Sequence, residues 1–287
     1  MWNHTLLDRY SSGHYTWNEL ILKSELFLLS NDYHTRPTFP LLPNVIPVPG
    51  VTVRPAKPFP DDFEKLFTRS RDQGIILVTF GSMASHVPEP VVVKFLDAFS
   101  RLEQTVIARL SVAEGIAVPE NVHVFRWLPQ NDILSDRRTR LFITHCGING
   151  LYEAIYHGVP MLGFPLFAEQ PANCAQMHRR GFGLRMNVHN FTSAELFANI
   201  QQLLGNDTYR DTVKRGSATL RDEPLFGPNK AAHWIEHVIK YGSAHLRSPV
   251  MDLPLYRFLM LDVLAVLIIS MFVVVIVACT FYYSSRN

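Results

Sequence analysis

Cysteine is scarce in this chain, which has three cysteines among its 287 residues. Cys146, Cys174 and Cys279 lie far apart, and Cys279 falls in a long apolar run near the end of the sequence. At most one disulfide is therefore expected, between the other two. The cysteines also do not have the paired spacing of a zinc site. The sequence predicts neither a disulfide framework nor a bound metal.

Charged residues are also few, at 18% of the chain, and the 27 basic and 25 acidic side chains nearly balance. A protein that binds nucleic acid needs a basic stripe, and none is present, so no nucleic-acid partner is predicted. Hydrophobic residues make up 47% of the sequence, which argues against long disordered segments and for a large core.

The start of the chain lacks the pattern of a secretory signal. Such a signal has a basic region followed by a clean apolar run. Residues 1–15 alternate between polar and apolar types, and Lys23 and Glu25 interrupt the next apolar stretch. Two interpretations follow: the sequence is a piece of a longer protein, or it is a naturally short form inserted through its C-terminal tail.

One long apolar run does occur, at residues 263–283, and it contains no charged residue. At 1.5 Å per residue it matches the roughly 30 Å hydrocarbon core of a bilayer, so a single membrane-spanning helix is predicted. Phe281, Tyr282 and Tyr283 are expected at the interface. Arg286 is the one charge in the short tail at 284–287, so the orientation of the span is weakly specified.

Prolines are concentrated in the first quarter of the chain. Residues 17–63 hold eight of them, a spacing that disfavours helices and favours an extended passage between two domains.

Beyond the prolines, apolar runs alternate with amphipathic segments. The run at 74–80 is rich in β-branched residues and stops at Gly81, as a buried parallel strand does. The alternation predicts an α/β fold with a mostly parallel sheet covered by helices on both faces. Strands are expected at 74–80, 105–110, 122–125, 141–144, 160–164 and 183–188, and helices at 90–102, 149–157, from 170, and at 193–204, 207–220 and 229–241.

Polar and small residues follow three of these strands, at the edge where parallel sheets bind ligands. They are Gly81–Ser82, the segment 145–150 and the segment 167–170. Glycines at 147 and 150 open a helix, whose free backbone N–H groups and dipole favour an anion such as a phosphate. Glu153 lies four residues after Asn149 on the same helix face, in reach of the hydroxyls of a ribose.

A cysteine nucleophile is not predicted beside His145. Cys146 is its neighbour in the sequence, but adjacent residues in a strand-end turn point apart, and a nucleophile needs its base within hydrogen-bond reach.

The stretch at 127–173, WLPQNDILSDRRTRLFITHCGINGLYEAIYHGVPMLGFPLFAEQPAN, resembles the signature of the UDP-glycosyltransferases, in particular the animal glucuronosyl- and glucosyltransferase branch. The segments NVIPVPGVTVRPAKPFPDDF, ILVTFGSM and AHLRSPVMDLPLYRFLMLDVLAV are also similar to that family. The resemblance covers the whole chain. It implies a remnant of an N-terminal acceptor domain at 1–45, an inter-domain linker at 46–72, a UDP-sugar-binding Rossmann-like domain of GT-B type at 73–245, a membrane-proximal segment at 246–262, a transmembrane helix at 263–283 and a tail at 284–287.

The resemblance also implies the site residues. Trp127 is expected to stack on the uracil, Gln130 to contact the base edge, His145 to bind the diphosphate and Glu153 to hold the ribose. Ser82, Gly147, Asn149 and Gly150 are expected to cradle the phosphates, and Glu169 and Gln170 to hold the sugar hydroxyls. No metal and no cofactor besides the donor are implied. The catalytic base of the family belongs to the N-terminal domain, and the context of His4, His14 and His34 does not match it.

Three residues depart from the family pattern. Cys146 stands where a second glycine is usual, Ile148 replaces a small residue, and Glu169 replaces an aspartate. Cys146 is expected to make the approach of the backbone to the phosphate tighter, and Ile148 to crowd the pocket. Glu169 has a side chain one methylene longer than aspartate.

The function implied is transfer of a hexosyl group, glucuronosyl ahead of glucosyl, from a UDP-sugar to a small lipophilic acceptor. The alternative is a catalytically silent membrane-bound partner that binds UDP-sugar or modulates full-length transferases, as a homo- or hetero-oligomer. A donor subunit completed by a separate acceptor protein is a third reading, which the linker and the remnant of the N-terminal domain disfavour. The family implies a single-pass protein of the endoplasmic reticulum with a lumenal catalytic domain, and sequons at Asn3, Asn190 and Asn206 are compatible with that location.

Overall fold

The computed structural model describes residues 15–30, 32–59, 61–70, 73–81 and 87–286. The chain divides into two units. The larger comprises 28–40 and 46–240, and the smaller comprises the residues up to Phe27, Leu41–Val45 and Tyr241–Asn287.

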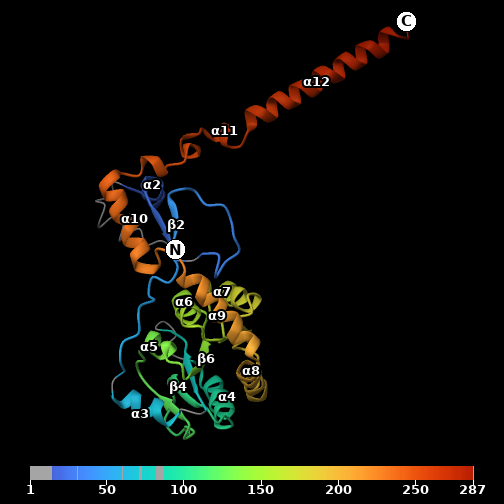
Figure 1. The fold of residues 1–287 in the computed structure, drawn as a ribbon. Coiled ribbons are helices and arrows are strands. Elements are labelled where there is room, and N and C mark those ends of the chain that lie inside the picture. Colours follow the sequence, from blue (N-terminus) through green and yellow to red (C-terminus); the bar gives the residue numbers. More distant parts are fainter. Residues whose placement is uncertain (1–14, 31, 60, 71–72, 82–86, 287) are drawn as a thin grey trace. The chain divides into compact units, whose positions relative to one another are not determined.

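A six-stranded parallel sheet forms the centre of the larger unit (Figure 1). Its strand order is β5-β4-β3-β6-β7-β8, so the chain starts in the middle, moves outward to one edge, and returns to fill the other side. This reversal between β3 and β6 is a topological switch point, where α/β sheets bind ligands. The strands are β3 (Ile75–Thr79), β4 (Thr105–Arg109), β5 (Val122–Val124), β6 (Thr139–Thr144), β7 (Met161–Gly163) and β8 (Gly183–Arg185).

Helices cover both faces of this sheet, because successive strand residues point to opposite sides. Ile76 and Val78 of β3 belong to one core cluster, and Ile75 and Leu77 belong to the other. The first cluster packs against α4 (Glu89–Ser100) and α8 (Ser193–Gly205). The second packs against α3 (Asp61–Arg69), α5 (Gln130–Ser135), α6 (Ile148–His157), α7 (Gln170–Arg179) and α9 (Asp207–Arg221). The helix α10 (Gly227–Tyr241) follows α9.

The six predicted strands and the alternation of strands and helices are confirmed. Five strands are one to three residues shorter than expected, and β6 is two residues longer, because it begins at Thr139. The expectation that 17–63 excludes helices is wrong at two places. The helix α2 (Trp17–Lys23) forms before the first proline, where Thr16 and Glu19 make a capping box. The helix α3 begins at Asp61, directly after the last proline.

The smaller unit contains α2, two short 3₁₀ turns (Ala244–Leu246 and Pro249–Asp252), α11 (Leu255–Phe258) and α12 (Leu261–Ser284). A separate two-stranded sheet pairs β1 (Phe27–Leu29) with β2 (Val45–Pro47). The helix α12 is 24 residues long, with a mean hydropathy of 3.1 and no buried residue. It is a candidate membrane span by length and composition, and it contains the predicted segment 263–283.

Candidate functional site

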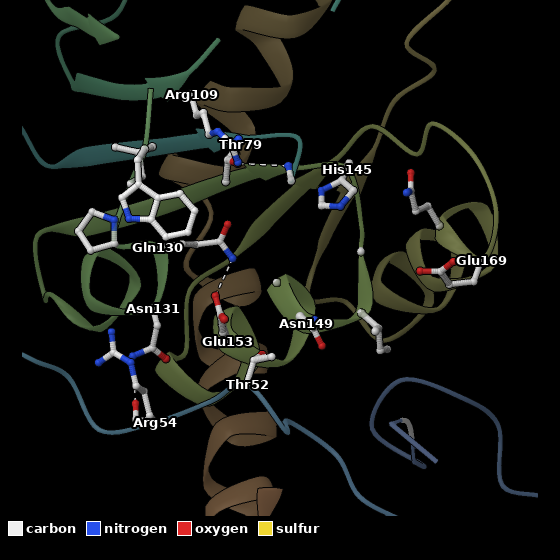
Figure 2. Close-up of a pocket in the computed structure, with 18 of the residues that line it drawn as sticks. Thr52, Arg54, Thr79, Arg109, Gln130, Asn131, His145, Asn149, Glu153 and Glu169 are labelled. Carbon is white, nitrogen blue, oxygen red and sulfur yellow. Dashed lines mark hydrogen bonds between the residues drawn. The ribbon is translucent and has the colours of Figure 1, made fainter. Parts of the chain in front are cut away.

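A cavity of about 620 Å³ lies in the larger unit, at the carboxyl ends of the parallel strands (Figure 2). Thr79 and Arg109 end β3 and β4 beside it, and His145 follows β6. Nine of the ten predicted site residues line this one cavity: Trp127, Gln130, His145, Gly147, Asn149, Gly150, Glu153, Glu169 and Gln170. The tenth, Ser82, lies outside the described residues.

Two glycines make room for the His145 ring. A Cβ atom on Gly81 would lie 2.7 Å from the ring, and one on Gly147 would lie 2.4 Å from its Nε2 atom. Burial lowers the pKa of His145, and the nearby charge of Glu169 opposes this shift in part. The imidazole is therefore neutral at pH 7, and one ring nitrogen can donate a hydrogen bond to an anionic oxygen.

The turn between β6 and α6 presents backbone N–H groups at the cavity. Gly147 is the N-cap residue of α6, no side chain caps this end, and the first intrahelical bond runs from Leu151 N to Gly147 O. The preceding N–H groups of Ile148, Asn149 and Gly150 are the ones that lack an intrahelical partner in any α-helix. The structure thus brings an uncapped helix N-terminus and His145 to the same end of the cavity.

Cys146 takes the left-handed conformation in this turn, with φ of 63°. Its side chain is fully buried and is not among the residues that line the cavity. The sulfur atoms of Cys146 and Cys174 both lie over Gly163, where an added Cβ would approach them to 2.4 and 2.3 Å. Burial raises the pKa of the Cys146 thiol far above its usual range, so the thiol stays protonated. This agrees with the expectation that Cys146 is no nucleophile.

Trp127 lies at the other end of the cavity (Figure 2). Trp127 is 72% exposed, and the guanidinium group of Arg109 lies 5.9 Å from the centre of its ring. A large exposed aromatic face at a cavity rim is a platform on which a planar ring can stack. Gln130 lies next to it and donates from Nε2 to Glu153 Oε2 at 2.6 Å.

Glu153 is a buried carboxylate at the centre of this end, with 8% of its surface exposed. Burial raises its pKa, while hydrogen bonds from Gln130 and Thr52 and the charge of Arg54 lower it. Figure 2 shows Glu153 pointing toward Gln130, with Thr52 beside it.

Several lining residues were not predicted from the sequence, and they include Thr52, Arg54, Thr79 and Arg109. Thr52 and Arg54 belong to the segment expected as a linker, and they reach the cavity by tertiary contacts that no local spacing reveals. Thr79 and Arg109 end two predicted strands, and this position at the carboxyl edge of the sheet is the sequence signal that indicates them.

The predicted sugar-binding pair lies where α7 begins. Ala168 has a left-handed conformation with φ of 54°, and Glu169 is the N-cap residue of α7. The buried Gln170 accepts hydrogen bonds at Oε1 from Leu166 N at 2.9 Å and Phe167 N at 3.2 Å. Its amide oxygen therefore supports the loop that carries Glu169.

Asp32, His34 and Glu223 are the one group in the described ranges whose ligand atoms lie close enough to hold a metal. These atoms already have protein partners. His34 Nδ1 lies 2.8 Å from Asp32 Oδ2, and Lys230 Nζ lies 3.0 Å from Glu223 Oε2. Asp32 also accepts from the hydroxyl of Tyr152 at 2.7 Å. The group is a structural network, and none of its members lines the cavity.

Comparison with known families decides the identity of the chain. The profile of the family described as "UDP-glucoronosyl and UDP-glucosyl transferase" matches residues 6–286. The chain belongs to this family.

Relatives of this UDP-glycosyltransferase chain are about twice its length. Human UDP-glucuronosyltransferase 2B7 is 35% identical over 263 residues, which are 91% of this chain and 50% of that protein. UDP-glucuronosyltransferase 2B33 of Macaca mulatta is 34% identical over 272 residues, 94% and 51% of the two proteins. The chain thus spans about half the length of these relatives.

Solved structures of glycosyltransferases share its fold. The spinosyn forosaminyltransferase SpnP matches with a TM-score of 0.67 at 19% identity, over 82% of this chain and 61% of that one. Os79 of O. sativa in complex with UDP matches with a TM-score of 0.55 at 19% identity, over 66% and 44%. The predicted fold class, a Rossmann-like parallel sheet of the C-terminal GT-B domain with one apolar C-terminal helix, is confirmed.

Proposed function

We propose that this chain supplies the donor-binding half of a membrane-anchored UDP-glycosyltransferase. The observation that carries this proposal is the convergence of nine predicted donor-site residues on one cavity at the carboxyl edge of the sheet. We assign the donor domain to 73–245, the linker to 46–72 and the membrane span to 263–283.

In this proposal the UDP lies along the cavity with its base on Trp127. Gln130 contacts the base edge, and Glu153 accepts hydrogen bonds from the ribose hydroxyls. The diphosphate lies at the α6 N-terminus beside His145, where backbone N–H groups and the helix dipole stabilise negative charge. Glu169 and Gln170 hold the sugar. In this proposal the UDP-sugar is held by hydrogen bonds and by the dipole of α6. No metal and no further cofactor are included.

The transferred group is a hexosyl unit, glucuronosyl ahead of glucosyl, and the acceptor is a small lipophilic alcohol or phenol. The acceptor oxygen forms a bond to the anomeric carbon while the bond to UDP breaks, and a base takes the acceptor's proton. His145 and the α6 N–H groups stabilise the charge that develops on the departing UDP. His34, although paired with Asp32, does not line the cavity, so the base is assigned to the acceptor half of the longer relatives.

Binding of UDP to the 287-residue chain in detergent micelles tests the donor site. A double variant, His145→Ala with Glu153→Ala, removes one group at each end of the cavity. We expect UDP binding by the unaltered chain and a loss of at least tenfold in the variant. The matched control, Glu114→Ala with His189→Ala, changes the same residue types at exposed positions outside the cavity and should bind normally.

The identity of the sugar is tested separately. Displacement of bound UDP is measured on the same chain with UDP-glucuronic acid and with UDP-glucose. UDP-glucuronic acid should displace UDP at the lower concentration. Equal displacement, or preference for UDP-glucose, would remove the glucuronosyl assignment and leave the donor site intact. A chain that binds no UDP would contradict the proposal itself.

A further inference from the structure

Apolar side chains are exposed along the segment 249–260, which directly precedes the candidate span α12. Six large apolar residues lie within 253–260, and their exposed fractions run from 41% at Leu253 to 69% at Leu255. Single exposed apolar side chains are ordinary on a protein surface, but a run of this kind is typical of a surface that binds a membrane or another protein.

A residue in the left-handed conformation separates this segment from α12. Met260 has φ of 54°, so α11 and α12 are separate helices. The first intrahelical bond of α12 runs from Leu264 N to Met260 O, and the N–H groups before it need partners outside the helical pattern. The N–H of Val263 donates to Asp262 Oδ1 at 2.9 Å. Hydrocarbon offers no hydrogen-bond partners and disfavours a carboxylate, so the start of α12 belongs in a polar layer.

The length of α12 agrees with a start in that layer. Its 24 residues span about 36 Å as an α-helix, which exceeds the roughly 30 Å hydrocarbon core of a bilayer. When the apolar middle of α12 fills the core, its ends lie in the headgroup layers. The segment 249–260 joins one of these ends without a linker, so it lies close to the membrane surface.

The charges of the segment are compatible with this surface. Arg247 Nη2 donates to Asp252 Oδ1 at 2.9 Å, so these two charges compensate each other. Arg257 is the one charged residue within 253–261, and its guanidinium lies 5.8 Å from the centre of the Tyr256 ring. The long apolar stem of an arginine can lie among acyl chains while its head contacts a phosphate. Tyrosine is also a residue that the interface favours.

We propose that residues 249–260 form an interfacial segment, which lies in the phospholipid headgroup layer of the membrane that α12 crosses. A 3₁₀ turn and the four-residue α11 leave backbone groups that hydrocarbon could not satisfy, so the segment does not enter the core of the bilayer. Its apolar side chains reach about 5–10 Å into the boundary between headgroups and acyl chains. Arg257 contacts lipid phosphate. This inference rests on the membrane anchor of the proposed function and not on its donor site.

Spin labels on single cysteines test the position of the segment in the full-length chain, reconstituted in phosphatidylcholine vesicles. Cys279→Ser removes the exposed native cysteine, and the other two cysteines are buried. Labels are attached at Leu255→Cys in the segment, at Leu267→Cys in the span and at Val118→Cys, an exposed position in the larger unit. Power saturation then measures the collisions of each label with oxygen and with a water-soluble nickel chelate.

The ratio of oxygen collisions to chelate collisions reports how deep a label lies, because apolar oxygen concentrates among acyl chains and the hydrated chelate is excluded from them. We expect this ratio to be several times higher at Leu255→Cys than at Val118→Cys. It should be higher still at Leu267→Cys, which lies nearer the centre of the bilayer.

A double variant separates apolar contact with lipid from mere closeness to the span. Tyr256→Ser with Phe258→Ser removes two exposed apolar side chains. The ratio at Leu255→Cys should then fall toward that of the label in the larger unit, while the label in the span keeps its value. The matched control, Ile235→Ser with Ile239→Ser, removes two exposed apolar side chains of α10 and should leave the ratio at Leu255→Cys unchanged.

Two outcomes overturn the inference and leave the anchor in place. A label at Leu255→Cys that meets the chelate as often as the label at Val118→Cys would place the segment in water. A label shielded from both reagents would mean that protein covers the segment.

Two other results concern the proposed function itself. Free access of the chelate to Leu267→Cys would contradict the membrane anchor and remove the basis of the inference. Failure of the same vesicles to bind UDP would contradict the donor site, and the position of the segment would stand.

Discussion

Glycine at position 147 allows the His145 ring to lie against the turn between β6 and α6. The backbone of Gly147 has φ of −63°, which any residue adopts, so an alanine there would not strain the main chain. Its Cβ would, however, lie 2.4 Å from His145 Nε2. The side chain that must give way is the imidazole that we assign to the diphosphate.

Gly147→Ala should therefore weaken UDP binding about tenfold, because His145 is displaced from the turn. The cost in stability should be about 1–3 kcal/mol, typical of overpacking. Gly205→Ala is the control, since a Cβ there meets nothing within 4 Å. Calorimetric titration with UDP and thermal unfolding check the two expectations, and an unchanged affinity in Gly147→Ala would count against the role of His145.

Neutral His157 is expected to make the stability of the chain depend on pH, and its partner Asn131 lines the cavity. Burial lowers its pKa from 6.5 to about 4, and the charge of Arg221 adds to this shift. Its Nε2 atom lies 3.2 Å from Asn131 Oδ1, so the neutral ring donates there. Below pH 6.5 the unfolded chain binds a proton that the folded chain excludes until pH 4, and stability is lost across that window.

His157→Gln keeps a donor at this position and cannot be protonated. The free energy of unfolding should therefore fall less steeply for the variant than for the unaltered chain between pH 6.5 and pH 4, by about 3 kcal/mol at most. Urea unfolding at several pH values measures this difference. Parallel pH profiles for the two proteins would show that His157 is already protonated, or solvated, in the folded chain.

At the scale of elements, the helix α6 ends at a glycine in the left-handed conformation. Gly158 is its C-cap, with φ of 72°, and its N–H bonds back to the helix at Ala154 and Ile155. An alanine in this left-handed conformation costs about 1–2 kcal/mol. The neighbour that a Cβ would meet, Lys214 Cγ at 3.2 Å, is flexible and adds little.

Gly158→Ala should thus lower the free energy of unfolding by about 1 kcal/mol and leave UDP affinity unchanged, because the opposite end of α6 faces the cavity. Denaturant unfolding with UDP titration on the same samples checks both. A loss of UDP affinity without a loss of stability would contradict this expectation. It would mean that the conformation at the C-terminus of α6 affects UDP binding at its N-terminus.

The elements that sequence reasoning found are those with a strong local signal. β3 and the Leu141–Ile143 part of β6 are apolar runs followed by polar residues and glycine, and this pattern has few other interpretations. The missed helices are short or lie beside prolines. α5 has six residues, and α2 depends on a capping box that a proline count overlooks. Five strands were predicted too long and β6 too short, because pairing with the neighbouring strands, and not hydrophobicity, decides where a strand begins and stops.

At the scale of the molecule, the residues of the site also divide into those that a local sequence signal indicates and those that it does not. His145, Glu153 and Glu169 were predicted from their places after strand ends or near helix starts, together with the family resemblance, and topology brings such positions together. Thr52 and Arg54 line the same cavity from a segment more than seventy residues before α5, where Asp132 binds Arg54. Nothing in their local sequence indicates that contact, because it depends on how the chain returns along the completed domain.

The side of the membrane on which the cavity lies depends on the orientation of the candidate span α12. Length and composition identify α12 as a candidate span but do not give its direction across a membrane. Two sequons of the donor domain are described by the structure, and both are accessible: Asn190 is exposed in a turn, and Asn206 is exposed at the start of α9. Asn206 Oδ1 accepts from Thr208 N at 3.0 Å, so its amide nitrogen is not needed for the cap.

If the donor domain is lumenal, as the family resemblance implies, Asn190 and Asn206 should carry glycans when the chain is expressed in animal cells, because sequons are modified in the lumen. Asn190→Gln and Asn206→Asp should each remove one glycosidase-sensitive shift in electrophoretic mobility. Aspartate is as good an N-cap as asparagine, so the second change leaves α9 stable and isolates the effect on the sequon. Occupied sites would place the cavity on the lumenal side of α12, and donor sugar would have to be supplied there. Two bare sites would place it in the cytosol and overturn the lumenal assignment without touching the donor site.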